Sequence, residues 1–275
     1  MTYERKIDFA IKLFRSIPQD GPLEISYSGG KDSDVILRLA QMSGVKHEAI
    51  YKQTSIDPPG TTAHAKEMGA TIIRPKHTFF QLMEKKGVPH RFARFCCEEL
   101  KEYKVYDRAV QGVRREESTA RSQRYKEPEM CRTYPRGEKT RVYFPILEWT
   151  LDDVARFIDE QEIKCAPVYY DKDGRFCAER RLGCIGCPLA TGWKRREQFK
   201  QYPGMLRQWI RSAKKFYLQK PETIDKYFGG NIYAKFYCDL FYENRKKYVD
   251  ATTDTLFDDT IDPKQYLETY FGIEL

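Results

Sequence analysis

The 275-residue sequence has no run approaching ~18 consecutive apolar residues, the length of a membrane span, so no span is expected. Its first residues, MTYERKIDFAIKLFRS, are charged and lack the apolar core of a secretory signal, so we expect a cytoplasmic protein. Low-complexity tracts and clear internal repeats are also missing. Acidic residues are the minority, 40 Asp and Glu against 48 Lys and Arg, and this excess of eight positive charges indicates an anionic partner.

Apolar residues make up 41% of the chain and aromatic residues 14%, which excludes a disordered protein and supports a folded core. Apolar periodicity predicts strands and helices in alternation, with a good N-cap at Thr150. The expected helices are 1–20, 32–42, 61–68, 79–86, 98–109 and 150–158, and the expected strands are 22–27, 47–52, 70–74, 110–114 and 141–145. This order predicts an α/β fold with a mostly parallel twisted sheet and helices on both faces.

The composition and the apolar periodicity of the sequence change near residue 190. No clear strand pattern follows, and the residues become basic, aromatic and helical in period. We therefore expect an α/β nucleotide-binding domain over 1–190, which includes a cysteine cluster, and a C-terminal helical extension over 191–275. A polar, charged stretch at 115–140 predicts a mobile loop.

A glycine-containing turn, SGGKDS, lies between the first expected strand and the helix that follows it. Glycine lets the backbone approach a ligand closely, and a helix N-terminus offers unpaired N–H groups and a positive dipole. Lys31 adds a point charge, and Ser28 and Ser33 add hydroxyl groups. The pattern predicts a phosphate or pyrophosphate site, although it matches neither the P-loop nor the dinucleotide fingerprint.

Four of the eight cysteines form two tight pairs, Cys96-Cys97 and Cys184-x-x-Cys187, with 86 residues between the pairs. Thiolates suit zinc or iron–sulfur sites. Adjacent cysteines seldom bind one zinc ion comfortably but could reach two irons of a cuboidal cluster. The pattern favours a [4Fe–4S] cluster. The alternatives are a zinc ion and four buried thiols that bind no metal and pack as small apolar side chains.

The turn SGGKDS resembles the PP-loop of the adenine-nucleotide α-hydrolase superfamily. The order PP-loop, CC, GVRREES, WTLDDV and CxxC over about residues 20–192 resembles the phosphoadenosine phosphosulfate (PAPS) reductase family. The two cysteine pairs look like the [4Fe–4S] ligands of adenylylsulfate (APS) reductases, and are similar to those of the iron–sulfur enzyme of DNA phosphorothioation. The resemblance implies an adenine nucleotide (ATP, APS or PAPS) bound at the carboxyl end of the sheet, with Mg²⁺ as a further candidate.

The resemblance also implies which residues contact the nucleotide. Asp57 either accepts a hydrogen bond from a ribose hydroxyl or shapes the turn before Pro58. Arg114 and Arg121 could hold phosphate or sulfate bidentately. The expected nucleotide-binding set is Ser26, Ser28, Gly29, Gly30, Lys31, Asp32, Ser33, Asp57, Gly112, Arg114 and Arg121, of which Lys31, Asp32 and Arg114 are the catalytic candidates.

The C-terminus departs from the reductase pattern. Sulfonucleotide reductases carry a late nucleophilic cysteine in an ECG-[LI]-H-like motif, whereas this chain ends in DPKQYLETYFGIEL. Its only late cysteine, Cys238, has aromatic neighbours that favour a core thiol. The leading hypothesis is therefore an iron–sulfur PP-loop enzyme that combines adenylation with sulfur transfer. The alternatives are an APS/PAPS reductase that releases sulfite and a non-catalytic nucleotide- and cluster-binding regulator.

Expected partners follow from these hypotheses. A sulfur donor or a thioredoxin-like reductant would supply the reaction, and an oligomer is compatible with the sequence. The basic, aromatic stretch 193–220 either holds nucleic acid through phosphate contacts and stacking or forms a helical face with solvated cations and buried aromatics.

Overall fold

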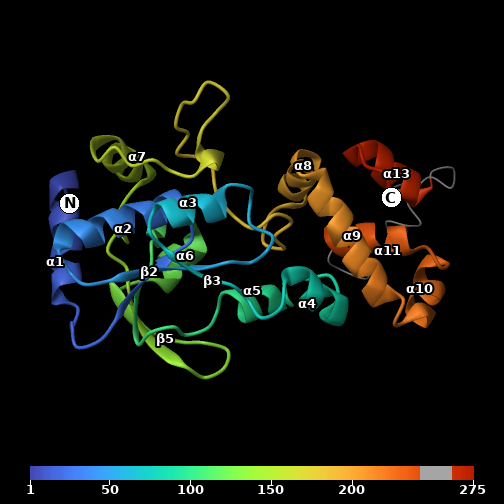
Figure 1. The fold of residues 1–275 in the computed structure, drawn as a ribbon, viewed down its shortest axis with the longest axis horizontal. Helices are drawn as coiled ribbons and strands as arrows, with labels where there is room; N and C mark the ends of the chain where they lie inside the picture. Colours follow the sequence, from blue (N-terminus) through green and yellow to red (C-terminus); the bar gives the residue numbers. More distant parts are fainter. Residues whose placement is uncertain (242–261) are drawn as a thin grey trace. The chain divides into compact units, whose positions relative to one another are not determined.

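The computed structural model describes residues 1–241 and 262–275, which divide into two compact units. The first unit comprises Met1–Gln53, Asp57–Pro75 and Lys101–Gly183, and the second comprises Thr54–Ile56, Lys76–Leu100 and the chain from Cys184. The sequence places one boundary at residue 190, whereas the second unit also takes in two earlier segments. Figure 1 shows the helices and strands of both units.

The first unit contains the sheet. Its elements are α1 (Tyr3–Ser16), β1 (Leu23–Tyr27), α2 (Lys31–Ser43), β2 (Glu48–Lys52), α3 (Thr61–Glu67), β3 (Thr71–Ile73), β4 (Arg108–Val110), the 3-10 turn η1 (Arg115–Glu117), α6 (Thr119–Arg124), β5 (Glu129–Thr133), β6 (Lys139–Tyr143), α7 (Leu151–Glu160) and η2 (Pro167–Tyr169). The strand order is β3-β2-β1-β4-β6-β5, and only β5 runs antiparallel to its neighbour. The predicted α/β fold with a mostly parallel sheet and helices on both faces is confirmed.

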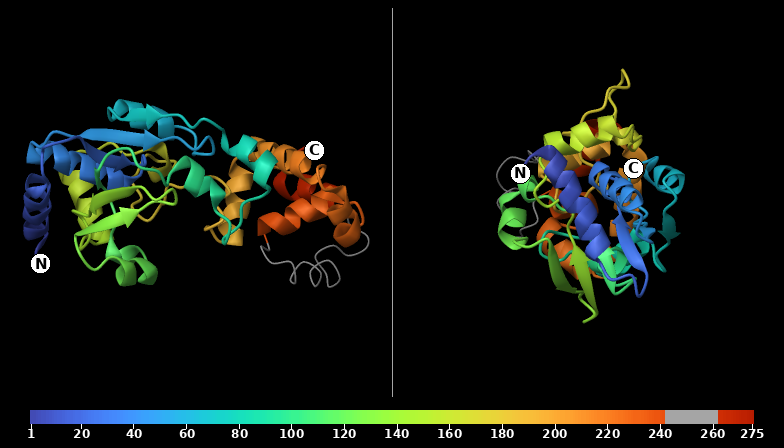
Figure 2. Two further views of the ribbon diagram at one scale, coloured as in Figure 1. Left: turned by 90° about the horizontal axis from the view of Figure 1, so that it is seen from below. Right: turned by 90° about the vertical axis from the view of Figure 1, so that its left-hand side faces the viewer.

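Alternation along β1 sends successive side chains to opposite faces of the sheet. Leu23, Ile25 and Tyr27 belong to the main core, together with apolar residues of α1, α2 and α7. Figure 2 shows α1 and α2 side by side in this layer. The predicted N-cap is confirmed, because the Thr150 side chain accepts a hydrogen bond from the Asp153 amide, 3.1 Å away.

The helix predicted over 98–109 is wrong for most of its length. The helix here is α5 (Phe95–Leu100), and the chain then reaches β4. Arg108 pairs in parallel with Leu23 on one side and Arg141 on the other, so sheet pairing overrides the local helical pattern. The loop predicted over 115–140 is also incorrect in part, because it contains η1, α6 and the edge strand β5, which hydrogen-bonds to β6.

The second unit is helical in its described residues. Its elements are α4 (Phe79–Lys86), α5, α8 (Gly192–Gln201), α9 (Pro203–Tyr217), α10 (Pro221–Phe228), α11 (Ile232–Phe241) and α13 (Pro263–Phe271). In the stretch 193–220, the aromatic residues Phe199, Trp209 and Tyr217 are at most 2% exposed, whereas Trp193 is 70% exposed. The Trp209 ring lies 4.7 Å from that of Phe79 on α4, which explains why this earlier helix joins the second unit. None of the described helices has the length and apolarity needed to cross a bilayer.

Candidate functional site

The turn Ser28–Ser33 joins β1 to α2 at the carboxyl end of the sheet, as the resemblance implies. Gly29 takes a φ of 74°, and a Cβ at this position would lie 2.7 Å from the Thr61 side chain, so the turn requires glycine. Gly30 caps α2 without a side chain of its own. No side chain of Gly29 or Gly30 covers the N-terminus of α2, so an anion can approach its backbone N–H groups and its positive dipole closely.

Lys31 and Arg114 converge on Asp32. Both cations are 4% exposed. The Lys31 amine lies 3.3 Å from one Asp32 oxygen, and the Arg114 Nε donates to the other at 2.6 Å. Two buried cations thus share one carboxylate, and the second Arg114 contact, at 2.8 Å, is to the more exposed Glu116.

The β4–α6 segment supplies a second charged layer. The Glu117 carboxylate accepts a hydrogen bond from the Arg114 amide at 3.3 Å and pairs with Arg121. The Glu117 carbonyl accepts from the guanidinium of Arg181, 3.4 Å away. These contacts hold the arginines of this segment in defined positions instead of leaving them on a solvated loop.

Tyr169 forms a wall of the site. Its ring lies 5.4 Å from the Lys31 amine, and its hydroxyl accepts hydrogen bonds from the amides of Lys31 and Leu182. Burial raises the pKa of the Tyr169 hydroxyl well above its ordinary value, so it remains protonated.

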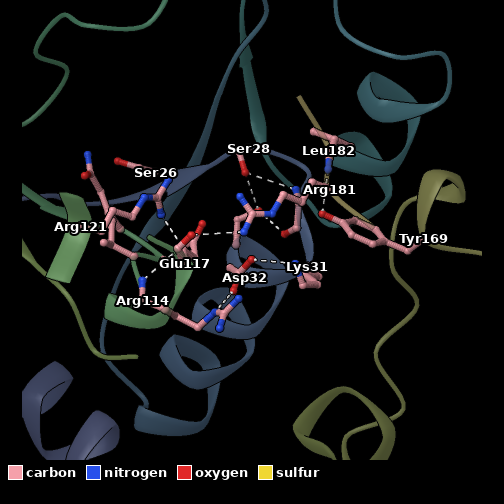
Figure 3. A pocket seen from close by; sticks show the side chains of 15 residues that line it. Ser26, Ser28, Lys31, Asp32, Arg114, Glu117, Arg121, Tyr169, Arg181 and Leu182 are labelled. Carbon is pink, nitrogen blue, oxygen red and sulfur yellow. Dashed lines mark hydrogen bonds and ion pairs between the residues drawn. The ribbon is translucent and has the colours of Figure 1, made fainter. Parts of the chain in front are cut away.

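These groups enclose a cavity of about 360 Å³, in the range of small-molecule sites, ~300–1,000 Å³ (Figure 3). Nine of the eleven predicted nucleotide-binding residues line it: Ser26, Ser28, Gly30, Lys31, Asp32, Ser33, Gly112, Arg114 and Arg121. Gly29 and Asp57 lie outside the lining. Four cationic side chains against two carboxylates leave an excess of two positive charges, which suits a polyanion.

Six lining residues were missed at the level of sequence: Gln111, Val113, Glu117, Tyr169, Leu182 and Arg181. Gln111, Val113 and Glu117 flank predicted positions in the GVRREES stretch and could have been included from their neighbours. Tyr169, Arg181 and Leu182 carry no local signal, because they approach the phosphate turn only through the path of the chain after α7.

A buried polar network lies behind the phosphate turn. Asp34 is fully buried, and its Oδ1 accepts from the Tyr27 hydroxyl and faces the His64 Nε2 at 3.0 Å. Burial and the charge of Asp34 raise the pKa of Tyr27, and the same two causes raise that of Cys165. The network ties α3 to α2, because both helices contribute to it.

We expect the Tyr27→Phe variant to lose about 1–3 kcal/mol of unfolding free energy, because it removes one of the hydrogen bonds to a buried carboxylate. Urea denaturation measures the loss. Tyr143→Phe is the matched control: Tyr143 is also a buried strand tyrosine, and its hydroxyl makes no hydrogen bond within the described part of the chain. An equal loss in both variants would contradict the assigned role of the network.

Gly112 is required by close approach. A Cβ at this position would lie 2.8 Å from the Asp32 carbonyl oxygen, a backbone atom that cannot move aside cheaply. We expect Gly112→Ala to weaken nucleotide binding about tenfold, roughly 1.4 kcal/mol, because the cavity wall must shift. Calorimetric titration with ATP measures the change. Gly183→Ala, where nothing lies within 4 Å of the added carbon, should leave the affinity unaltered.

The second unit brings the four predicted metal-binding cysteines together. Cys96 is buried, and Cys97, Cys184 and Cys187 are half-buried. A hydrogen bond with Cys97, burial, and the nearby thiols of Cys97, Cys184 and Cys187 raise the pKa of Cys96. The CxxC turn is held by the Ile185 amide, which donates to the Ile56 carbonyl at 2.8 Å.

Across residues 1–241 and 262–275, no three His, Cys, Asp or Glu side chains are placed to hold one metal ion. The separate cysteine Cys238 is 1% exposed, and burial raises its pKa to about 12. Its thiol is therefore neutral at physiological pH, as expected for a core residue.

Comparison with known proteins places this geometry in context. Residues 22–190, more than half of the chain, match the model of the phosphoadenosine phosphosulfate reductase domain. An uncharacterised protein of Methanocaldococcus jannaschii is 29% identical over 220 residues, 74% of this chain and 50% of that protein. An uncharacterised 37.8 kDa protein of Escherichia phage 186 is 33% identical over 147 residues, 48% of this chain and 41% of that protein. The chain thus spans about half the length of these relatives or less.

Similar solved structures include phosphoadenylyl-sulfate reductase from Candida auris in a phosphate complex, with 14% identity and a TM-score of 0.46 over 67% of this chain and 95% of that one. FMN adenylyltransferase from Candida glabrata, in complex with FMN and an ATP analogue, has 16% identity and a TM-score of 0.45 over 66% of this chain and 62% of that one. The segment 22–190 that matches the family model contains β1, the turn Ser28–Ser33 and all lining residues of the cavity. Because the family model matches more than half of its length, the chain belongs to the phosphoadenosine phosphosulfate reductase domain family.

Proposed function

We propose that this protein is an enzyme that binds an adenine nucleotide, with ATP as the leading candidate, and uses it for adenylation and sulfur transfer to an acceptor. The observation that carries the proposal is the positively charged cavity at the N-terminus of α2, where Lys31 and Arg114 are buried beside the phosphate turn. Such an arrangement stabilises negative charge on phosphate oxygens at little reorganisation cost. Mg²⁺ would accompany the phosphates of ATP.

The proposed chemistry has two displacement steps. An acceptor oxygen attacks the α-phosphorus of ATP, the bond from that phosphorus to its bridging oxygen breaks, and pyrophosphate leaves with the electron pair. A sulfide nucleophile then attacks the activated acceptor carbon and forms a C–S bond, and AMP leaves with the C–O electron pair. Lys31 and the α2 N-terminus would offset the charge that develops on the phosphates, and Arg121 and Arg181 would orient them.

We propose a [4Fe–4S] cluster on Cys96, Cys97, Cys184 and Cys187. The donor set fits, because four soft thiols from two segments lie close enough to perturb one another. The adjacent cysteines Cys96 and Cys97 are less suited to the zinc alternative, because paired ligands of structural zinc usually have two to four residues between them. When bound, the cluster would supply electron transfer or a binding point for sulfur.

The reductase alternative requires a thiolate nucleophile late in the chain. Cys238 does not meet this need, because it is buried among apolar and aromatic residues and its pKa is raised to about 12. This favours sulfur transfer over sulfite release.

A nucleic acid acceptor is compatible with one helix of the second unit. Arg207, Arg211 and Lys214 lie on the exposed face of α9 at positions i, i+4 and i+7, and none pairs with an acidic group in the described part of the chain. Phe199, Trp209 and Tyr217 of the stretch 193–220 are buried, so most contacts would be to phosphates. Trp193 is 70% exposed and is a candidate for stacking on a base.

The decisive experiment is a binding and product panel on protein purified without oxygen. ATP, APS and PAPS are titrated separately, and pyrophosphate, AMP and sulfite are assayed with sulfide and with thioredoxin. The proposal expects ATP to bind and no sulfite to form. Sulfite from APS or PAPS would support the reductase, and nucleotide binding with no turnover under any condition would support a regulatory protein.

A further inference from the structure

We infer that Ser26 is a specificity-determining residue that acts only as a hydrogen-bond acceptor, because the buried carboxylate of Glu24 takes its single proton. Its ligand partner is then an N–H or O–H donor of the nucleoside, either the purine 6-amino group or a ribose hydroxyl. The inference rests on the proposed function, since it assumes that a nucleotide occupies the cavity.

Glu24 and Ser26 lie on the same face of β1, opposite Leu23, Ile25 and Tyr27 of the core. Ser26 lines the cavity (Figure 3), whereas Glu24 is 1% exposed and is not part of the lining. The Ser26 hydroxyl is 2.7 Å from Glu24 Oε1. The central strand β1 therefore places the buried Glu24 carboxylate within hydrogen-bond distance of the Ser26 hydroxyl, which lines the cavity.

Lys52 on β2 forms an ion pair with Glu24. Its amine lies 3.7 Å from Glu24 Oε1, donates to the Tyr103 carbonyl at 2.6 Å, and sits 4.4 Å from the centre of the Tyr103 ring. An ionised carboxylate has no proton to give, so in the short contact between Ser26 and Glu24 the serine must be the donor. The second carboxylate oxygen, Oε2, is buried without a hydrogen bond in the described structure.

The consequence is a fixed polarity at the cavity wall. A serine hydroxyl has one proton and two lone pairs, so donation to Glu24 leaves only lone pairs for a ligand. Ser28, two residues further along, begins the phosphate turn, and this spacing corresponds to ~7 Å along an extended chain. With phosphates at the turn, the nucleoside lies at Ser26, where a carbonyl oxygen in place of an amine or hydroxyl would be repelled.

The test compares ATP with three analogues that each change one donor: inosine triphosphate, 2′-deoxy-ATP and 3′-deoxy-ATP. We expect one analogue to bind the wild type about tenfold more weakly than ATP, which identifies the donor as base or ribose. In Ser26→Ala that ratio should fall to within about twofold, because ATP loses the same contact. A loss of folding would lower the affinity for ATP and analogues alike, and would not change the ratio.

A second variant tests Glu24 without stranding a buried charge. Glu24→Met combined with Lys52→Met removes both partners of the ion pair, and we expect it to lose the same discrimination because the Ser26 hydroxyl can then turn and donate. Glu24→Gln retains an accepting oxygen and should keep the ratio. Equal wild-type affinity for ATP and all three analogues would overturn the inference while leaving nucleotide binding intact, whereas failure of ATP to bind at all would overturn the proposed function itself.

Discussion

Replacing Lys31 by alanine is expected to weaken ATP binding about 100-fold while leaving the iron content of the protein unchanged. The Lys31 amine is held in a water-poor position at the N-terminus of α2 by Asp32 and the ring of Tyr169. Charge-assisted hydrogen bonds from such a group contribute about 1.5–3 kcal/mol, and the upper value corresponds to roughly 150-fold in affinity. Titration calorimetry on protein purified without oxygen measures the change.

Two controls separate ligand binding from folding in this experiment. Lys12→Ala removes an exposed lysine of α1 and should leave affinity for ATP within about twofold of the wild type. Iron content reports on the second unit, which contains none of the cavity residues. If Lys31→Ala loses nucleotide binding and iron together, Lys31 is a folding residue and the phosphate site is misassigned.

If the proposed [4Fe–4S] cluster is present, with about four iron atoms per chain, replacing Cys187 by serine is expected to reduce bound iron to less than one atom per chain. Cys187 is half-buried, so its replacement disturbs the core of the second unit less than that of the buried Cys96. Iron and acid-labile sulfide are measured with the visible absorption spectrum. Affinity for ATP should persist, because every lining residue of the cavity belongs to the first unit.

The matched control for the cluster is Cys131→Ser. Cys131 is an exposed cysteine of the edge strand β5 in the first unit, whereas the four paired thiols belong to the second unit. Its replacement should retain the full iron content. A colourless wild-type protein with one zinc ion, or equal loss of iron from both variants, would contradict the cluster assignment.

Local chemistry explains which parts of the fold could be predicted from sequence. The phosphate turn, β1 and α2 follow from glycine freedom and apolar periodicity within a short window, and all three occur where predicted. The same is true of the Thr150 cap, whose partner is only three residues away. The helix expected over 98–109 failed because β4 is decided by pairing with β1 and β6, which are distant in sequence.

The candidate site shows the same division. Residues near the turn and in the GVRREES stretch were predicted because they carry recognisable chemistry, whereas Tyr169 and Arg181 join the cavity through long-range packing alone. The roles within the site also depend on contacts. Sequence presents Glu24 as a charged residue in a strand, and only the structure shows that it accepts a hydrogen bond from the cavity-lining Ser26 and pairs with Lys52.

The α/β class and the glycine turn before α2 could be read from the sequence, because backbone freedom and side-chain charge belong to individual residues and their near neighbours. The tertiary structure alone decided that the cysteine pairs meet within a helical unit assembled from separate segments, and that Arg114 is paired with Asp32. The physical reason is that burial and charge pairing depend on distances in space, which apolar packing of remote segments sets.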